Sequence, residues 1–421
     1  MQRKTSSLAK AVLTVLSITL LLVTGAWAGP KYRVLYTFKG GKDGGQPLGG
    51  LIFDGSGSLY GTTAQGGKGC APSGCGTVFK LTLDSSGKWT KTVLHYFSGS
   101  DGASPEASLV FDAKGNLYGT TYDGGQENCS GYGCGAVFEL TPSSGGRWKE
   151  TILHRFAGGR DGATPWAGLV FDAAGNLYGA TTHGGGALCD CGTVFELSRA
   201  AGGGWSEQVL HGFSGPDGQS PFNVILDAAG NLYGVTAYDG AYGVGVAFEL
   251  APGAGGWNDT TMYNFPGSPD GALPDYGLAF EGSNLYGTTD VGGAGFGTIF
   301  ELKPSSNGGR AESVIYRFAG GKDGAYPGGG LIFDKEGNLY GSTGGDLHYH
   351  AGNIFKLMPK VGGKWGLRVL YTFTDHKEGQ FPGGVISDVR GNLYGIAAAG
   401  GDLQCTGGGG QGCGVVFELT P

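Results

Sequence analysis

The stretch GNLYGTT at residues 115–121 decides the fold, because close copies of it recur along the chain. The copies are GSLYGTT (57–63), GNLYGAT (175–181), GNLYGVT (230–236), SNLYGTT (283–289), GNLYGST (337–343) and GNLYGIA (391–397). Their tyrosines, Tyr60, Tyr118, Tyr178, Tyr233, Tyr286, Tyr340 and Tyr394, are separated by 58, 60, 55, 53, 54 and 54 residues. A period of this length is typical of solenoids and propellers, in which each repeat is one supersecondary unit.

Each repeat contains four short apolar runs in the same order. In the second repeat they are SLVFD (108–112), NLYGTT (116–121), GAVFEL (135–140) and WKETILHRF (148–156). The runs are rich in β-branched and aromatic residues and are bounded by Gly, Asp, Ser or Pro, which indicates strands. Four consecutive antiparallel strands form one blade of a β-propeller. The sequence therefore predicts an all-β, seven-bladed β-propeller of four-stranded antiparallel blades.

The two ends of the repeat region predict how the ring closes. YRVLYTF (32–38) is a run of the fourth type, whereas GVVFELTP (414–421) is a run of the third type. If the first of these strands completes the last blade, every blade has four strands and no sheet edge is left unpaired. We therefore expect residues 32–38 to pair with residues 414–421.

The repeated phrase itself is predicted to be structural. Inner strands of a propeller are covered on both faces, and neighbouring residues such as Leu117 and Tyr118 point to opposite faces. Gly119 is expected to leave room for an aromatic ring. A residue found in every repeat serves the scaffold that all repeats share, so the phrase is not expected to be an active site.

The first 28 residues have the features of a secretory signal peptide. A basic start with Arg3, Lys4 and Lys10 precedes the apolar run AVLTVLSITLLLVTGA, and AWA (26–28) supplies small residues for cleavage. We expect cleavage after Ala28 and a secreted or periplasmic protein, with an uncleaved anchor as the alternative. Residues 29–421 would then be a single propeller domain.

Charge limits the possible partners. The chain has 28 Lys and Arg against 35 Asp and Glu, and loss of three basic residues with the signal changes the net charge from −7 to 25 − 35 = −10. Nucleic-acid binding requires a basic groove, so no nucleic-acid partner is expected. The mature chain has no apolar run long enough for a membrane-spanning helix. We expect a monomer without a cofactor.

All eight cysteines fall in loops between the second and third runs. They form the close pairs Cys70 and Cys75, Cys129 and Cys134, Cys189 and Cys191, and Cys405 and Cys413. Because export leads to an oxidising compartment, we predict a disulfide within each of these four loops. The bond between Cys189 and Cys191 would be the most strained, since one residue separates them. Zinc bound by neighbouring loops is the alternative.

The repeats resemble the GloVer tandem repeat of exported bacterial proteins. NLYGTTYDGG (116–125) with CGAVFEL (134–140), and NLYGTTDVGGAGFGTIFEL (284–302), carry the resemblance, which covers residues 32–421. Members of that family differ in their surface-anchoring tails, whereas this chain ends at a strand. GLVFDAAGNLYGATT (168–182) also resembles the inner strands of NHL-type and streptogramin-lyase propellers. These resemblances imply the fold and no particular activity.

Candidate ligand-binding residues lie where the repeats differ. The loops between second and third runs, and those from each fourth run to the next blade, emerge on one face, where propellers generally bind ligands. Aromatic residues predicted to line the mouth at that face are Trp166, Phe222, Tyr276, Tyr326 and Phe381. Packing of each ring against its own blade is the alternative. Five further tryptophans that begin fourth runs are expected to pack on outer strands.

The three loops without cysteine belong to consecutive repeats and form a second candidate region. They carry Tyr238, Tyr242, Phe296, His348 and His350. In the HYH segment both imidazoles face one side of an extended chain, and with Asp346 they could bind a metal ion.

Other histidines and acids have simpler interpretations. His95, His154 and His211 share a repeat position with tyrosines and are expected to be structural hydrogen-bonding rings. The Asp-Gly pairs that precede most inner strands indicate turns and not calcium sites, because one acid per blade is far from six or more oxygen ligands.

The sequence thus favours a binding or interaction module for a glycan or a protein at the variable loop face. The alternative is an extracellular lyase or hydrolase with a site at the mouth, although no catalytic residues can be grouped from the sequence.

Overall fold

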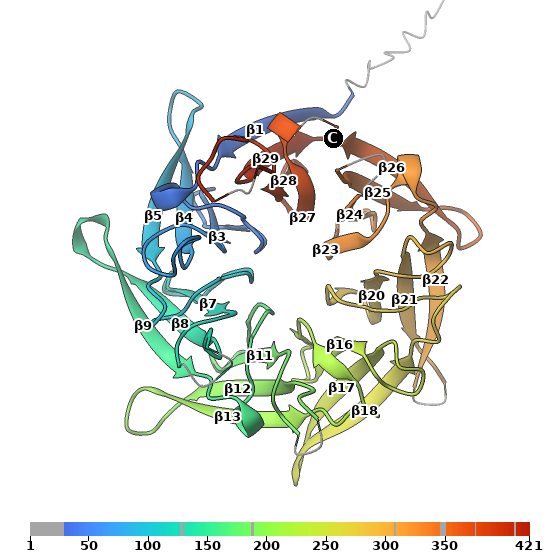
Figure 1. Ribbon diagram of the computed structural model, residues 1–421. Coiled ribbons are helices and arrows are strands. Elements are labelled where there is room, and N and C mark those ends of the chain that lie inside the picture. Colours follow the sequence, from blue (N-terminus) through green and yellow to red (C-terminus); the bar gives the residue numbers. More distant parts are fainter. Residues whose placement is uncertain are drawn as a thin grey trace, which may run out of the picture.

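The described residues form a closed ring of seven β-sheets (Figure 1). The structure is a computed structural model, and it describes residues 29–421 except 127–128, 130, 187–188, 307–308, 346–350, 375 and 408–409. The predicted signal peptide therefore lies outside the described residues. In the described part there is no α-helix, and no helix is long and apolar enough to cross a membrane. The predicted seven-bladed propeller of four-stranded antiparallel blades is confirmed.

Each blade has an innermost, a second, a third and an outermost strand. The innermost strands of blades 1 to 7 are β2 (Ile52–Phe53), β6 (Val110–Phe111), β10 (Val170–Phe171), β15 (Ile225–Leu226), β19 (Leu278–Glu281), β23 (Pro327–Phe333) and β27 (Gln380–Ser387), with β14 (Gln219–Pro221) as an additional strand in blade 4. The second strands are β3 (Leu59–Thr63), β7 (Leu117–Thr121), β11 (Leu177–Thr181), β16 (Leu232–Tyr238), β20 (Asn284–Thr289), β24 (Leu339–Thr343) and β28 (Leu393–Ala399).

The third strands are β4 (Thr77–Leu83), β8 (Ala136–Pro142), β12 (Thr193–Arg199), β17 (Val246–Gly253), β21 (Thr298–Pro304), β25 (Asn353–Pro359) and β29 (Val415–Thr420). The outermost strands are β5 (Trp89–Tyr96), β9 (Trp148–Arg155), β13 (Trp205–Gly212), β18 (Gly256–Asn264), β22 (Arg310–Arg317), β26 (Trp365–Thr372) and, in blade 7, β1 (Lys31–Thr37). Short 3-10 turns are η1 (Gly41–Asp43), η2 (Ser144–Gly146), η3 (Gly159–Asp161), η4 (Gly321–Asp323) and η5 (His376–Glu378).

The ring closes as predicted, through pairing of the two ends of the chain. β1 runs antiparallel to β29, from Lys31 opposite Thr420 to Thr37 opposite Val415. The N–H of Phe38 then donates a 3.0 Å hydrogen bond to the carbonyl of Gly414. Both strands lie side by side in blade 7 (Figure 1). Closure therefore removes the two sheet edges that an open array of blades would expose.

The repeated phrase forms the seams between blades, as the sequence indicated. Tyr60 of blade 1 packs in one buried cluster with Leu117 and Phe138 of blade 2, and the equivalent residues meet at the other seams. A Cβ atom on Gly119 would lie 2.7 Å from Cζ of Phe138, so the glycine makes room for that ring. The hydrophobic core is accordingly divided into clusters that each join neighbouring blades.

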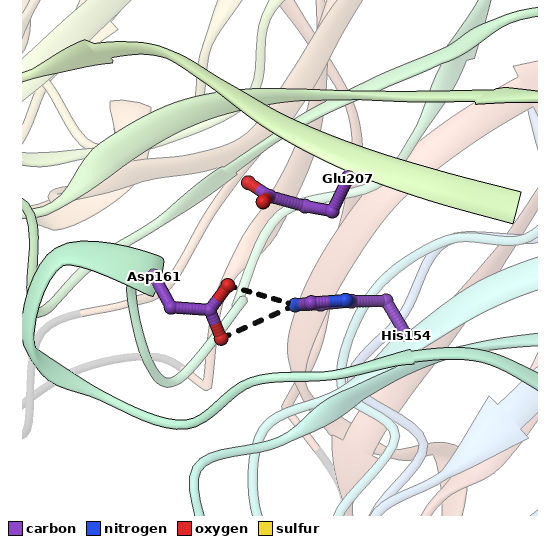
Figure 2. A group of neighbouring side chains, drawn as sticks. All are labelled: His154, Asp161 and Glu207. Carbon is purple, nitrogen blue, oxygen red and sulfur yellow. Dashed lines mark hydrogen bonds and ion pairs between the residues drawn. The ribbon is translucent and has the colours of Figure 1, made fainter.

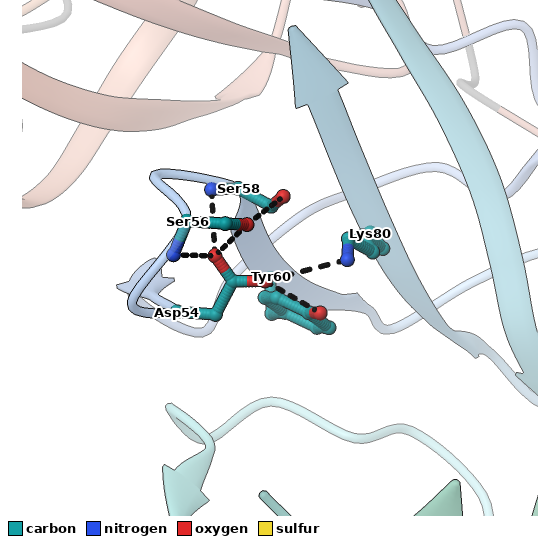
Figure 3. A network of polar contacts seen from close by, with 5 residues as sticks. All are labelled: Asp54, Ser56, Ser58, Tyr60 and Lys80. Carbon is teal, nitrogen blue, oxygen red and sulfur yellow. Dashed lines mark hydrogen bonds and ion pairs between the residues drawn. The ribbon is translucent and has the colours of Figure 1, made fainter.

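The hairpin between the innermost and second strands explains why an acid precedes the phrase (Figure 3). Asp54 Oδ1 accepts 2.9 Å hydrogen bonds from the backbone N–H groups of Ser56 and Ser58, and the Tyr60 hydroxyl donates to Asp54 Oδ2 at 3.0 Å. Burial alone would raise the pKa of Asp54, but these hydrogen bonds hold it well below its usual range. Lys80 completes the network with an ion pair of 3.3 Å.

The first run is shorter as a strand than expected. The sequence predicted a strand over 108–112, whereas only Val110–Phe111 pairs with β7. The residues before Val110 leave the sheet because they belong to the segment that crosses from one blade to the next.

Candidate functional site

The candidate site lies at the mouth of the propeller, on the face formed by the connectors. A connector is the segment between the outermost strand of one blade and the innermost strand of the next. In every connector, or at the start of the innermost strand that follows it, the residue before proline has a left-handed backbone, with φ from 51° to 56°: Gln46, Ser104, Thr164, Ser220, Leu273, Tyr326 and Phe381. Non-glycine residues adopt this conformation only where surrounding contacts impose it.

Hydrogen bonds at both ends hold each of these residues in place. The N–H of Thr164 donates to the carbonyl of Cys134 in the preceding blade at 2.8 Å, and its carbonyl accepts from the N–H of Thr182 at 3.2 Å. Ser104 is held in the same way by Cys75 and Tyr122. The connectors therefore present the residues that follow proline in a fixed geometry around the mouth.

Three rings from consecutive blades form an aromatic row, which consists of Tyr122, Trp166 and Phe222. The ring of Trp166 lies 5.7 Å from that of Tyr122 and 5.7 Å from that of Phe222. Trp166 is 45% exposed. Large rings that are packed on one side and open to solvent on the other are suited to stacking on a ligand. Tyr122 was missed from the sequence, although other repeats have Ala, Thr, Asp or Gly at its position.

Two pairs of carboxyl groups lie in loops of the same face: Glu106 with Asp123 in blade 2, and Asp275 with Asp290 in blade 5. Burial, and secondarily the charge of Asp123, raises the pKa of Glu106 to about 7. Burial, and secondarily Asp290, raises the pKa of Asp275 to about 8. Oδ1 of Asp275 is buried without a hydrogen-bond partner among the described residues. Asp275 therefore carries a proton at neutral pH and can donate a hydrogen bond. The sequence gives no warning of these pKa values, because they arise from burial.

A cavity of about 310 Å³ lies between the innermost strands of blades 2 to 6 and is lined by Tyr276, Ser108, Gly168 and Asn223 among others. Oδ1 of Asn223 accepts from the N–H of Gly168 at 2.7 Å, and Ser108 Oγ accepts from the N–H of Gly50 at 2.9 Å. Tyr276 is 41% exposed and directly follows Asp275. A residue of the cavity wall, Tyr276, is therefore the direct sequence neighbour of Asp275.

The other aromatic candidates have different surroundings. Tyr326 and Phe381 are partly exposed at their connectors, but among the ring contacts of the described residues none joins them to the aromatic row. Tyr238 and Tyr242 are exposed on the side without disulfides. Phe296 is partly buried and packs against the cluster that joins blades 5 and 6. The candidate metal ligands Asp346, His348 and His350 lie outside the described residues.

Phe296 fills the place that a disulfide takes in other blades. All four predicted cysteine pairs are disulfide-bonded, so zinc ligation by these cysteines is wrong. A Cβ atom on Gly158 would lie 2.9 Å from Sγ of Cys129, and one on the equivalent Gly320 would lie 3.0 Å from the ring of Phe296. A ring and a disulfide therefore pack against the same connector position.

Comparison with solved structures supports the fold alone. A putative 6-phosphogluconolactonase from Bacteroides uniformis is 14% identical, with 83% of this chain and 89% of that chain covered and a TM-score of 0.51. A hypothetical selenium-binding protein from Sulfolobus tokodaii is 10% identical, with 74% of each chain covered and a TM-score of 0.51. No curated protein sequence matches the chain.

The repeat, in contrast, identifies a family. The model of the Gloeobacter/Verrucomicrobia repeat matches residues 22–203 and 185–417, which together span nearly the whole chain. This match confirms the resemblance that the repeated phrase indicated. The chain belongs to the Gloeobacter/Verrucomicrobia repeat family.

Proposed function

We propose that the protein is an exported binding module that holds a glycan at the mouth of the propeller. The observation that carries the proposal is the aromatic row, in which the half-exposed ring of Trp166 contacts the rings of Tyr122 and Phe222. Rings of this kind stack on the apolar faces of sugar rings. Export is supported by the four disulfides, which form and persist in oxidising compartments.

Polar groups of the connectors and of the cavity wall suit sugar hydroxyls. The protonated carboxyl of Asp275 is a donor, and Asn223 offers an amide at the cavity wall. Because the connectors are held by hydrogen bonds on both sides, little ordering is needed when a ligand binds, which favours affinity.

A glycan array on the mature protein, followed by calorimetry with the best ligand, tests the proposal. Truncation of a central tryptophan costs about 2 kcal/mol or more, or roughly a 30-fold increase in Kd, so Trp166→Ala should weaken binding by at least this factor. Tyr132→Ala is the matched control, because Tyr132 is an exposed ring outside the row. Failure of every glycan to bind, or equal binding by Trp166→Ala, would overturn the proposal.

A second candidate function is acid-catalysed cleavage of a glycan by a lyase or hydrolase. The pKa values of about 7 and about 8 for Glu106 and Asp275 favour it, because carboxyls raised into this range can act as general acids. Incubation of bound glycans with wild-type, Glu106→Gln and Asp275→Asn proteins, followed by detection of new chain ends, tests it. Absence of cleavage by the wild type leaves binding as the function.

A further inference from the structure

A group of three residues, all polar at six of the seven seams, occurs at each seam near the outside of the ring. We call it the seam triplet: a residue of the outermost strand, an acid of the following connector, and a residue of the next outermost strand. The seven triplets are Tyr36, Asp43 and Lys91; His95, Asp101 and Glu150; His154, Asp161 and Glu207; His211, Asp217 and Asp259; Tyr263, Asp270 and Glu312; Tyr316, Asp323 and Leu367; and Tyr371, Glu378 and Tyr32.

Two of these triplets bring one imidazole and two carboxylates together. In the first, Nε2 of His154 lies 3.1 and 3.2 Å from the two carboxylate oxygens of Asp161, and Glu207 extends toward both from β13 (Figure 2). One ligand atom from each residue lies within 4.8 Å of the others.

The second triplet repeats this arrangement one blade further. His211 Nε2 lies 2.9 Å from Oδ2 of Asp217, and ligand atoms of these residues and Asp259 again lie within 4.8 Å of one another.

The first triplet has an acceptor atom that nothing in the described structure satisfies. Oε1 of Glu207 is buried and has no hydrogen-bond partner among the described residues, and the same is true of Oε1 of Glu150 in the His95 triplet. Burial raises the pKa of Glu207 to about 7, while His154 opposes this effect and Asp161 adds to it. A carboxylate in such surroundings is stabilised by a cation.

Another seam shows that a cation fits at this position. In the triplet that joins blades 7 and 1, Lys91 stands where Glu207 stands, and its Nζ lies 3.0 Å from Oδ1 of Asp43. The Lys91 side chain is only 2% exposed. The same place in the repeat therefore accommodates the charged end of a buried lysine, and the histidine-containing triplets have a carboxylate there instead.

We propose that the triplets His154–Asp161–Glu207 and His211–Asp217–Asp259 each bind one divalent transition-metal ion. Imidazole nitrogen and carboxylate oxygen are ligands of zinc, and three protein ligands leave a fourth position for water. The side chains of His154 and Asp161 are 21% and 24% exposed, so an ion can enter from solvent. The His95 triplet has the same residue types, but its ligand atoms are not among those that converge within 4.8 Å.

Such ions would tie together the blades that carry the aromatic row. Asp161 and Asp217 lie in the same connectors as Trp166 and Phe222, five residues before each ring. An ion at each seam would thus fix the start of a connector whose end presents a ring at the mouth. The metal proposal does not depend on the identity of the ligand at the mouth.

Calorimetric titration of chelator-treated mature protein with zinc chloride at neutral pH tests the proposal. Two ions per chain and a rise in Tm are expected. Cobalt(II) at the same sites should give a visible ligand-field spectrum. Glu207→Gln and Asp259→Asn should each remove one ion, and the double variant should remove both.

Glu312→Gln is the matched control, because Glu312 holds the same repeat position in a triplet that has Tyr263 in place of histidine. It should retain both ions. Without metal, the carboxylates of Glu207 and Asp259 have no cation beside them. The metal-free Glu207→Gln and Asp259→Asn variants should therefore have a Tm no lower than that of the metal-free wild type. Absence of zinc and cobalt binding by the wild type, or undiminished binding by the double variant, would overturn the proposal.

Discussion

Replacement of Asp275 by Asn should change how the stability of the protein depends on pH. In the folded chain burial raises the pKa of Asp275 from its ordinary value of 3.8 to about 8. Below about pH 4 the group is protonated in both the folded and the unfolded state and contributes no pH dependence. Between about pH 4 and pH 8 the unfolded chain releases the proton and the folded chain retains it, so the free energy of unfolding falls as the pH rises.

The magnitude follows from the two pKa values. The pKa of Asp275 rises from 3.8 to about 8 on folding, and each pKa unit is equivalent to 1.36 kcal/mol. The ionised carboxyl therefore lowers the free energy of unfolding by on the order of 5 kcal/mol. This destabilisation is complete only above about pH 8. An asparagine at this position does not titrate, so Asp275→Asn should be close to the wild type in stability near pH 4 and more stable by several kcal/mol near pH 9.

Urea unfolding followed by tryptophan fluorescence, at four values between pH 4.5 and pH 9, measures this effect. When the free energy of unfolding of the wild type is subtracted from that of the variant, the contributions of all titrating groups that both proteins share cancel. Asp290→Asn is a useful comparison, because Asp290 secondarily raises the pKa of Asp275 and its removal should weaken the dependence without abolishing it. A variant whose advantage over the wild type is the same at every pH would refute the reasoning.

Three further predictions concern the ring. Deletion of residues 29–38 removes the strand that pairs with β29, so the product should aggregate or lose much of its Tm in calorimetry; a monomer with unchanged Tm would contradict the closure model. Reduction of the disulfides should lower Tm only moderately and leave the far-UV circular dichroism spectrum unchanged, because each disulfide closes a short loop and adds at most about 3 kcal/mol to the free energy of unfolding. Gly179→Ala places a Cβ 2.6 Å from the ring of Phe195 and should cost about 1–3 kcal/mol in urea unfolding, whereas Gly55→Ala, with no atom within 4 Å, should be nearly neutral.

Much of the scaffold could be predicted from the sequence. The period of the tyrosine phrase, the four apolar runs and the types of the first and last runs predict seven blades and their closure, because strand formation and blade order depend on local patterns. The disulfides could also be predicted, since each pair lies within one loop. The sequence also predicted that Gly119 leaves room for an aromatic ring, and the structure identifies that ring as Phe138 of β8.

The candidate sites depended on tertiary structure, for a physical reason. His154 and Glu207 stand 53 residues apart, and Tyr122 and Trp166 stand 44 apart, so each pair meets only because adjacent blades pack side by side. Asp161 looks like an ordinary turn residue until its side chain is seen against His154. Likewise, the pKa of Asp275 is set by what covers it and not by its neighbours in the chain. The sequence by itself determined the ring, because the order of the four strands depends on the local pattern within each repeat. Only the tertiary structure decided which variable residues meet between repeats.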